Sequence, residues 1–125
     1  MAIKWNRCSG GIWCELFKLN LDHDYFASLD GVYIVWYEKK GEIVCLNVGY
    51  GNIVRELKKL KSDIAVKAFA EHGLYVTWSN LSKAQQLGTT IYLAKTLSPK
   101  ISSVLPKALP LKINLPWDDE DDDDE

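Results

Sequence analysis

The sequence predicts a small α/β (α+β) domain in which helices flank a mostly antiparallel sheet of three strands. Residues 31–37, Gly-Val-Tyr-Ile-Val-Trp-Tyr, are β-branched or aromatic at odd and even positions alike. This pattern is typical of a central strand buried on both faces. Residues 53–61 carry Ile53, Leu57 and Leu60 at helical spacing, which predicts an amphipathic helix. The chain has 125 residues, enough for one domain with its own core.

The first 29 residues are expected to form an N-terminal extension that packs on this core. Within it, residues 11–19 are apolar and partly alternating, which predicts a strand or an extended segment. Residues 42–48 form the returning strand of a hairpin, after a turn in which Gly41 is free to adopt a left-handed conformation. The glycine-rich residues 49–52 are expected to end that strand.

Each predicted helix begins after residues that can cap it: Asn52 for the first helix, Ser62-Asp63 for the second and Asn80 for the third. Pro99 is expected to end the last helix. The predicted elements are a helix over 53–61, a short helix over 64–71, a strand over 74–78 and the longest helix over 81–97. The buried side of the helix over 81–97 is expected to carry Ala84, Leu87, Ile91 and Ala94.

The C-terminal part of the chain divides into a strap and an acidic tail. Three prolines keep the chain extended, so residues 109–117 are predicted to wrap the body and to complete a domain over 30–117. Eight of the 17 acidic residues occupy positions 118–125, which leaves the rest of the chain with a balance of +6. Such a run of like charges stays solvated, so this tail is predicted to be disordered. It either serves solubility or mimics nucleic acid and covers a basic face of its own domain.

Cysteine usage and the N-terminus both indicate a cytoplasmic protein without a cofactor. No apolar run follows the first charged residues, so no secretory signal is expected. Cys8, Cys14 and Cys45 are predicted to be reduced thiols, with Cys45 in the core. Their spacing to His23 matches no zinc pattern. No membrane partner and no small-molecule cofactor are expected.

The order and spacing of several short motifs resemble the core of the GIY-YIG endonucleases. Gly31-Val32-Tyr33 lies on one strand, Asn47-Val48-Gly49 on its partner, and Asn52-Ile53 opens a helix. The segment 48–53, Val-Gly-Tyr-Gly-Asn-Ile, and the closing 113–117, Ile-Asn-Leu-Pro-Trp, are similar to a group of small bacterial GIY-YIG proteins. The resemblance covers about residues 30–100 and implies the same fold.

The resemblance also implies a site that hydrolyses phosphodiesters with one divalent metal, but most of the expected residues are replaced. Tyr33 and Gly49 match the family. Asn47 stands at the position of a second tyrosine, and Glu56 at the position of an arginine that stabilises phosphate charge. Thr90 stands at the position of the metal-binding glutamate, and a hydroxyl is a poor substitute for a carboxylate on a hard cation. Arg55 lies one residue before the expected arginine position, and one residue along a helix turns the side chain by about 100°.

We therefore expect a catalytically degenerate GIY-YIG domain that acts in nucleic-acid binding or as an adaptor. The densest basic patch comprises Arg55, Lys58, Lys59 and Lys61, and these side chains are candidates for phosphate contacts. The alternative is that they form only the solvated face of an amphipathic helix.

Two other functions stay open at this stage. The first is an active endonuclease with relocated groups, in which Glu56 binds Mg²⁺ or Mn²⁺ beside Tyr33 and Arg55. The second is a protein-interaction module, since tryptophan is enriched at interfaces. The exposed candidates for such an interface are Trp5, Trp13 and Trp117, whereas Trp36 and Trp78 are expected in the core. His72 precedes Gly73 at a helix end, where a cation is favoured by the helix dipole.

Overall fold

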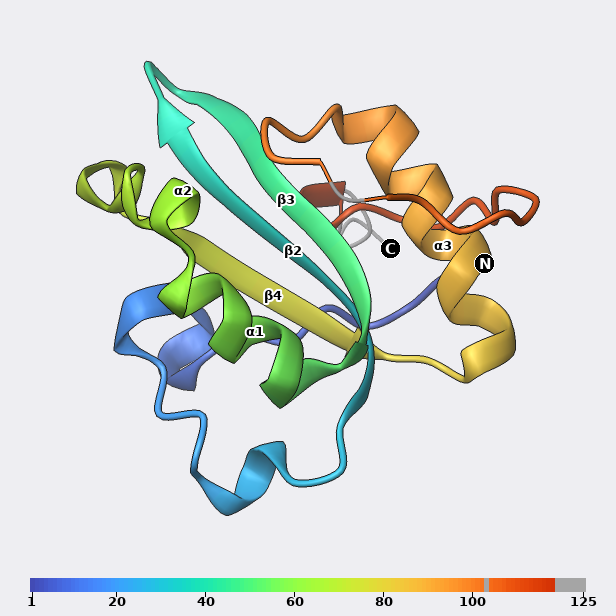
Figure 1. Ribbon diagram of the computed structural model, residues 1–125, viewed down its shortest axis with the longest axis horizontal. Coiled ribbons are helices and arrows are strands. Elements are labelled where there is room, and N and C mark those ends of the chain that lie inside the picture. Colours follow the sequence, from blue (N-terminus) through green and yellow to red (C-terminus); the bar gives the residue numbers. More distant parts are fainter. Residues whose placement is uncertain (103, 119–125) are drawn as a thin grey trace.

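The computed structural model describes residues 1–102 and 104–118, which form an α+β fold around a four-stranded antiparallel sheet (Figure 1). The strands are β1 (Cys14–Glu15), β2 (Asp30–Lys39), β3 (Glu42–Asn52) and β4 (Tyr75–Asn80), and the helices are α1 (Ile53–Ser62), α2 (Ile64–Lys67) and α3 (Lys83–Leu97). The strands lie in the order β1-β4-β2-β3. The predicted three-stranded sheet is thus extended by one short N-terminal strand. The predicted tail lies outside the described residues except for Asp118.

Strand β2 is the centre of the sheet, as its sequence predicts. Its even-numbered residues, Val32, Ile34 and Trp36, face one side, and its odd-numbered residues, Tyr33, Val35 and Tyr37, face the other. All six side chains are at most 4% exposed. Both faces are therefore covered, each by its own hydrophobic core.

Helices α1 and α2 cover the face of the odd-numbered β2 residues (Figure 1). Ile53, Leu57 and Leu60 form the buried stripe of α1, as predicted. Asn52 and Asp63 cap α1 and α2, each through a side chain that accepts a hydrogen bond from a backbone N–H. The prediction of one helix over 64–71 is wrong, since α2 stops at Lys67 and a separate 3₁₀ turn over Ala70–His72 follows.

Helix α3 lies on the opposite face of the sheet, together with the N-terminal residues and the strap. The predicted start of α3 is wrong, because Asn80 is the last residue of β4 and the helix begins after Ser82. The predicted buried side is right in part: Ile91 is buried, Leu87 and Ala94 are half-buried, and Ala84 is exposed. The buried face of α3 carries Gln86, Gly88, Thr89, Thr90, Ile91 and Leu93. Ala84 lies two residues before the buried Gln86, about 200° around the helix, so it faces away from the core.

The strap, which was predicted only to wrap the body, crosses α3. The backbone N–H of Leu111 donates to Gly88 O over 2.9 Å, and a Cβ at Gly88 would lie 2.6 Å from Leu109 O. Glycine is thus required on the helix where the strap passes. Ile113 is 3% exposed, and Asn114 Oδ1 accepts from the backbone N–H of Ile3 over 2.7 Å. The strap therefore joins the two ends of the described chain.

Strand β3 is longer than its sequence predicts. Residues 49–52 do not end it but continue the pairing with β2, from Tyr33↔Gly49 to Asp30↔Asn52. Backbone hydrogen bonds with β2 outweigh the weak strand preference of the two glycines. The extension carries Tyr50 and Gly51 up to the start of α1, which positions the site described below.

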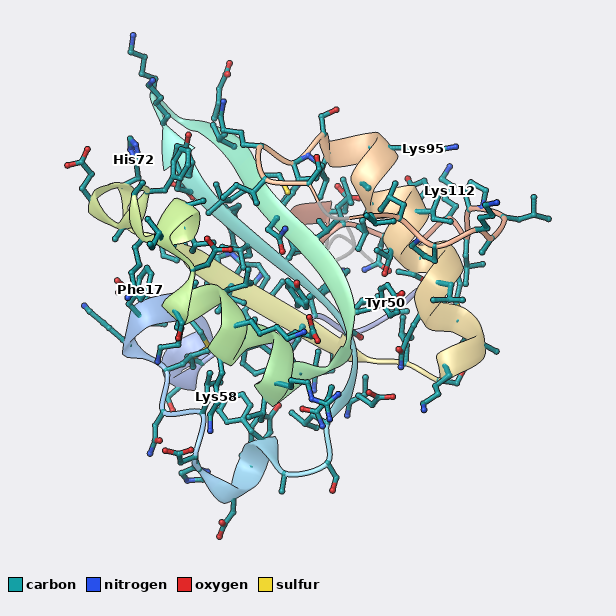
Figure 2. The ribbon with its side chains drawn as sticks, viewed as in Figure 1. Phe17, Tyr50, Lys58, His72, Lys95 and Lys112 are labelled. Carbon is teal, nitrogen blue, oxygen red and sulfur yellow. A yellow bond between two sulfur atoms is a disulfide. The ribbon has the colours of Figure 1, made fainter. Side chains whose placement is uncertain are left out.

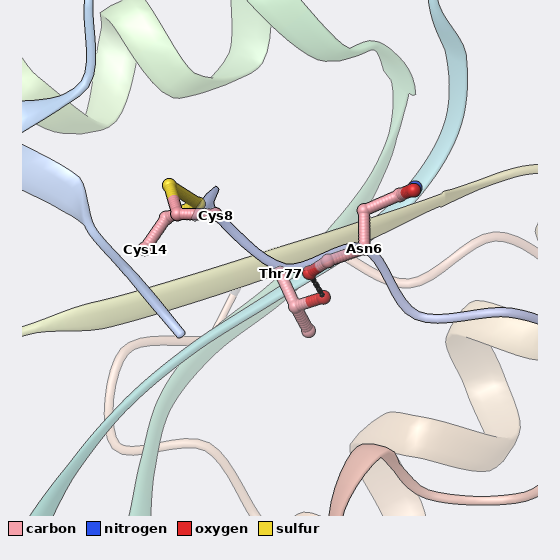
Figure 3. The surroundings of a disulfide bond; sticks show 4 residues. All are labelled: Asn6, Cys8, Cys14 and Thr77. Carbon is pink, nitrogen blue, oxygen red and sulfur yellow. Dashed lines mark hydrogen bonds between the residues drawn. A yellow bond between two sulfur atoms is a disulfide. The ribbon is translucent and has the colours of Figure 1, made fainter. Parts of the chain in front are cut away.

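The N-terminal segment is fastened to β4 and closed by a disulfide between Cys8 and Cys14 (Figure 3). Thr77 Oγ1 on β4 donates to the Asn6 backbone carbonyl over 2.7 Å. The prediction of reduced thiols is wrong for this pair, because the chain between the two cysteines turns back and brings their Cα atoms to 5.1 Å. Cys45 is free and buried, as predicted.

The tryptophans serve the core more than the surface. Trp5, predicted to be exposed, is 4% exposed, and its Nε1 donates to Asn114 O over 2.9 Å. Trp13 and Trp117 are half-buried. Each packs edge-on against Trp36, with ring centroids 5.3 Å apart. Trp36 and Trp78 are in the core, as predicted. Within the described residues, no helix combines the length and apolar character that a membrane crossing needs.

Candidate functional site

A cleft of about 310 Å³ lies at the β3 edge of the sheet, between the start of α1 and the middle of α3. It is lined by five of the six residues selected for the catalytic positions: Tyr33, Gly49, Arg55, Glu56 and Thr90. They come from β2, β3, α1 and α3. The sixth, Asn47, is 2% exposed and lies beneath the cleft, where it contacts Tyr33. Positions 57 residues apart in the sequence thus meet in one place. This cleft is called the Tyr33 cleft below.

A buried chain of hydrogen bonds fixes Tyr33. Its hydroxyl donates to Asn47 Oδ1 over 2.9 Å, and Asn47 Nδ2 donates to the Ile101 carbonyl over 2.8 Å. The backbone N–H of Ile101 in turn donates to Leu46 O over 2.8 Å. The segment after α3 therefore fastens to β3 through Asn47. An asparagine with both amide ends engaged in this way orients the tyrosine.

The Tyr33 phenol stays protonated. Burial raises its pKa well above 10.0, and the negative charge of Glu56 raises it further. A phenol with a raised pKa does not form a phenolate that could accept a proton near neutral pH. Tyr33 is therefore a hydrogen-bond donor or acceptor in the cleft and not a general base.

Arg55 and Glu56 are neighbours in the sequence, and both line the Tyr33 cleft. The angular step on the helix was expected to turn Arg55 away. Arg55 nevertheless lines the cleft, which meets α1 at its first turn and includes both residues. Glu56 Oε2 lies 3.3 Å from Lys59 Nζ. Within the described residues, Arg55 forms no ion pair with an acidic side chain.

The donors of the Tyr33 cleft do not fit a divalent metal ion. Thr90 is 2% exposed, and its hydroxyl donates to the backbone carbonyl of Gln86 over 2.8 Å. Glu56 supplies a carboxylate but is paired with Lys59. Hard cations select several oxygen ligands with carboxylates among them. Within the part of the chain that the structure describes, no group of three or more His, Cys, Asp or Glu side chains could hold a metal.

The lysines of the predicted basic patch have partners on the outer side of α1. Lys58 Nζ lies 2.9 Å from Asp22 Oδ1 and lowers the pKa of that carboxyl group. Lys61 Nζ donates to the Leu19 carbonyl over 2.9 Å. Figure 2 shows Lys58 directed away from the sheet, toward the N-terminal segment. Exposed ion pairs of this kind are weak, so these lysines remain available to a stronger anion.

Sequence reasoning missed a larger cavity next to the Tyr33 cleft. Its volume is about 630 Å³, and it shares Tyr50, Gly51, Asn52 and Arg55 with the cleft. Tyr50 is 36% exposed and lies between the end of β3 and α3 (Figure 2). An aromatic residue between two glycines was the available signal, since a large side chain there stands free of its neighbours. The other walls include Asp30 and Lys83, which no motif connects.

The two histidines have local roles. His23 caps a 3₁₀ turn by accepting the Tyr25 N–H at Nδ1 over 3.0 Å. His72 stacks on Tyr37 with ring centroids 4.4 Å apart, at the left end of the sheet in Figure 2. Neither borders the Tyr33 cleft.

Comparisons of the chain with protein-family models, curated proteins and solved structures found no match.

Proposed function

We propose that the chain is a degenerate GIY-YIG domain whose Tyr33 cleft binds the phosphodiester backbone of nucleic acid without cleaving it. The observation that carries this proposal is the meeting of Tyr33, Gly49, Arg55, Glu56 and Thr90 around one cleft. These are positions at which the resemblance implies site residues. The start of α1, the β2–β3 hairpin and α3 bring these residues together, as the resemblance implies. The fold assignment to this family is part of the same proposal.

Binding is assigned to Arg55 in the first instance. Its guanidinium is always charged and offers a planar set of donors that suits phosphate oxygens. It stands in the first turn of α1, where the helix dipole also favours an anion. The exposed Lys58 and Lys59 lie on the same helix and would extend the contact along a strand. Lys61 is also on this helix but is partly buried and bonded to the Leu19 carbonyl, so it would contribute least.

The absence of cleavage follows from three side chains. Glu56 places a negative charge where a phosphate would need a cation, and its charge raises the pKa of Tyr33. Thr90 offers a hydroxyl where the family resemblance puts a carboxylate. Transition-state charge in phosphoryl chemistry is stabilised by cations held in place before the reaction. The cleft supplies Arg55 but no group of ligands for a metal ion among the described residues.

Binding is tested by titrating the full chain with labelled single-stranded and duplex DNA at about 50 and 200 mM salt, a range over which phosphate contacts weaken strongly. Arg55→Ala is expected to weaken binding about tenfold, as loss of a hydrogen-bonded charge does. Lys67→Ala, an exposed cation on α2, is the matched control and should leave affinity unchanged. A parallel protein that ends at Asp118 shows whether the acidic run competes with DNA. Absence of binding by both proteins at low salt contradicts the proposal.

Cleavage is tested by incubating supercoiled plasmid with the same two proteins and Mg²⁺ or Mn²⁺, with a chelator control. No nicking is expected. Chelator-sensitive nicking that disappears in Tyr33→Phe and in Glu56→Ala would instead establish an active endonuclease with relocated groups. The expected stability loss of Tyr33→Phe is checked separately by thermal unfolding.

A further inference from the structure

We infer that the 630 Å³ cavity beside the Tyr33 cleft is a binding site for a nucleoside monophosphate, either free or at the end of a strand. The inference deepens the proposed function and, for a strand end, rests on it. The volume lies within the range of about 300–1,000 Å³ that is usual for small-molecule sites. The cavity and the cleft share the wall formed by Tyr50 and Arg55, so one ligand can cross from one to the other.

The positive charge of the cavity comes from two helices. Arg55 is in the first turn of α1, and Lys83 is the first residue of α3. In the part of the chain that the structure describes, neither cation forms an ion pair with a carboxylate. Residues of the first turn of each helix line the cavity, and the positive end of a helix dipole favours an anion there. Two cations on two different elements match the double charge of a phosphate monoester better than the single charge of an internal phosphodiester.

Asp30 defines a second, different subsite in the same cavity. Its Oδ2 accepts a hydrogen bond from Gln86 Nε2 over 3.1 Å, and the same nitrogen donates to Leu81 O over 2.8 Å. Gln86 is only 3% exposed, so the carboxylate is held by a buried amide. A fixed carboxylate repels an anion but accepts hydrogen bonds from hydroxyl groups. A sugar hydroxyl beside a phosphate satisfies both requirements.

Tyr50 supplies the apolar surface that a base requires. Its ring is 36% exposed on the wall between the cavity and the cleft. Bases stack on such rings without regard to their sequence. The cavity thus offers three subsites that match the parts of a nucleotide: Arg55 and Lys83 for the phosphate, Asp30 for the sugar and Tyr50 for the base. Inorganic phosphate would use only the phosphate subsite.

The inference is tested by calorimetric titration of the full chain with adenosine monophosphate, adenosine and inorganic phosphate. The nucleotide is expected to bind at least about tenfold more tightly than either fragment, because charged hydrogen bonds and stacking act together. Lys83→Ala should weaken nucleotide binding about tenfold, since it removes one cation from the phosphate. Lys95→Ala, an exposed lysine in the last turn of the same helix, is the matched control and should have no effect.

A second variant tests the sugar subsite. Wild type should prefer adenosine monophosphate over its 2′,3′-dideoxy form, and Asp30→Asn should lose that preference while still binding both. A merely structural role of Asp30 would lower both affinities in parallel. Retention of the wild-type preference in Asp30→Asn overturns the assignment of the sugar to Asp30.

The source of the nucleotide is resolved with single-stranded oligonucleotides that carry a terminal phosphate or a terminal hydroxyl. Tighter binding of the phosphorylated strand that depends on Lys83 assigns the cavity to strand ends, and equally tight binding of the free nucleotide assigns it to the free form. If Lys83→Ala binds both the nucleotide and the phosphorylated strand as tightly as wild type does, the inference is overturned. Binding of the hydroxyl-ended strand that still depends on Arg55 would in that case leave the proposed function intact.

Discussion

Gly49 faces Tyr33 across the β2–β3 pair, and the Tyr33 ring occupies the space that a Cβ atom on residue 49 would need. The contact involves the hydroxyl, Cζ and Cε2 atoms of the ring. The ring is 4% exposed and its hydroxyl is bonded to Asn47, so it cannot move aside without breaking a buried hydrogen bond. Glycine at this position is thus what allows the tyrosine to lie over the strand and reach the cleft.

We predict that Gly49→Ala lowers the free energy of unfolding by about 1–3 kcal/mol, the usual cost of overpacking a core. Chemical denaturation of wild type and variant measures this change. The control is the same substitution in a Tyr33→Leu background, where the distal ring atoms are absent and the added cost should be smaller. An equal loss in both backgrounds would locate the cost in the strand and not in the ring contact.

The disulfide between Cys8 and Cys14 should contribute to stability through the short loop that it closes. The two cysteines are six residues apart, and a loop of this length corresponds to about 2 kcal/mol in the chain-entropy model. We predict that a reductant lowers the free energy of unfolding by roughly this amount. The variant with Cys8→Ser and Cys14→Ser should start from the lower value and show no response to the reductant. A free-thiol count on the denatured, unreduced protein should find Cys45 alone, and three thiols would contradict the bridge.

The central strand, the amphipathic helix and its cap could be predicted because each depends on a local pattern. The apolar residues at odd and even positions of 31–37 indicate burial on both faces. The helical spacing of Ile53, Leu57 and Leu60 places them on one stripe, whichever residues they contact. The start of α3 could not be predicted, because Asn80 and Ser82 are both capable caps. Only the pairing of β4 with β2, which reaches Asn80, decides between them.

The candidate site was predictable in its members but not in its surroundings. The resemblance placed Tyr33, Gly49 and Thr90 at its site positions, and the fold brings these three residues to one cleft. The proximity of Arg55 to the same cleft could not be derived from a helical angle, because it depends on where β3 ends and α1 begins relative to the cleft. The larger cavity escaped notice because Asp30 and Lys83 are 53 positions apart and belong to no motif.

The buried thiol of Cys45 should make the fold sensitive to alkali. Burial raises its pKa from 9.0 to about 12. The folded state thus retains a proton that the unfolded state releases above pH 9, and its stabilising contribution is complete below that pH and is lost as pH rises toward 12. The free energy of unfolding should fall by up to about 1.4 kcal/mol per pH unit in this window.

This slope is measured by denaturation at several pH values between about 8 and 10, below the range in which Tyr33 adds a similar effect. Cys8→Ser and Cys14→Ser are present throughout, so that no thiolate can exchange with the disulfide. Cys45→Val in that background should give a flatter dependence on pH. Parallel curves for the two proteins would assign the alkaline sensitivity to other groups.

Thr90 is the position at which a single substitution should give the cleft a metal ligand. It is 2% exposed and lines the Tyr33 cleft on the side of α3, across from Glu56 on α1. We predict that Thr90→Glu is less stable than wild type without metal, because it buries a carboxylate beside another. Saturating Mn²⁺ should then raise its melting temperature by roughly 5 °C, as a ligand that binds only the folded state does. Wild type and Thr96→Glu, which places the same side chain on an exposed position of α3, should show no such rise. A melting temperature of Thr90→Glu that does not respond to Mn²⁺ would show that residue 90 does not stand at a ligand position, and the assignment of Thr90 to the family's glutamate would be wrong.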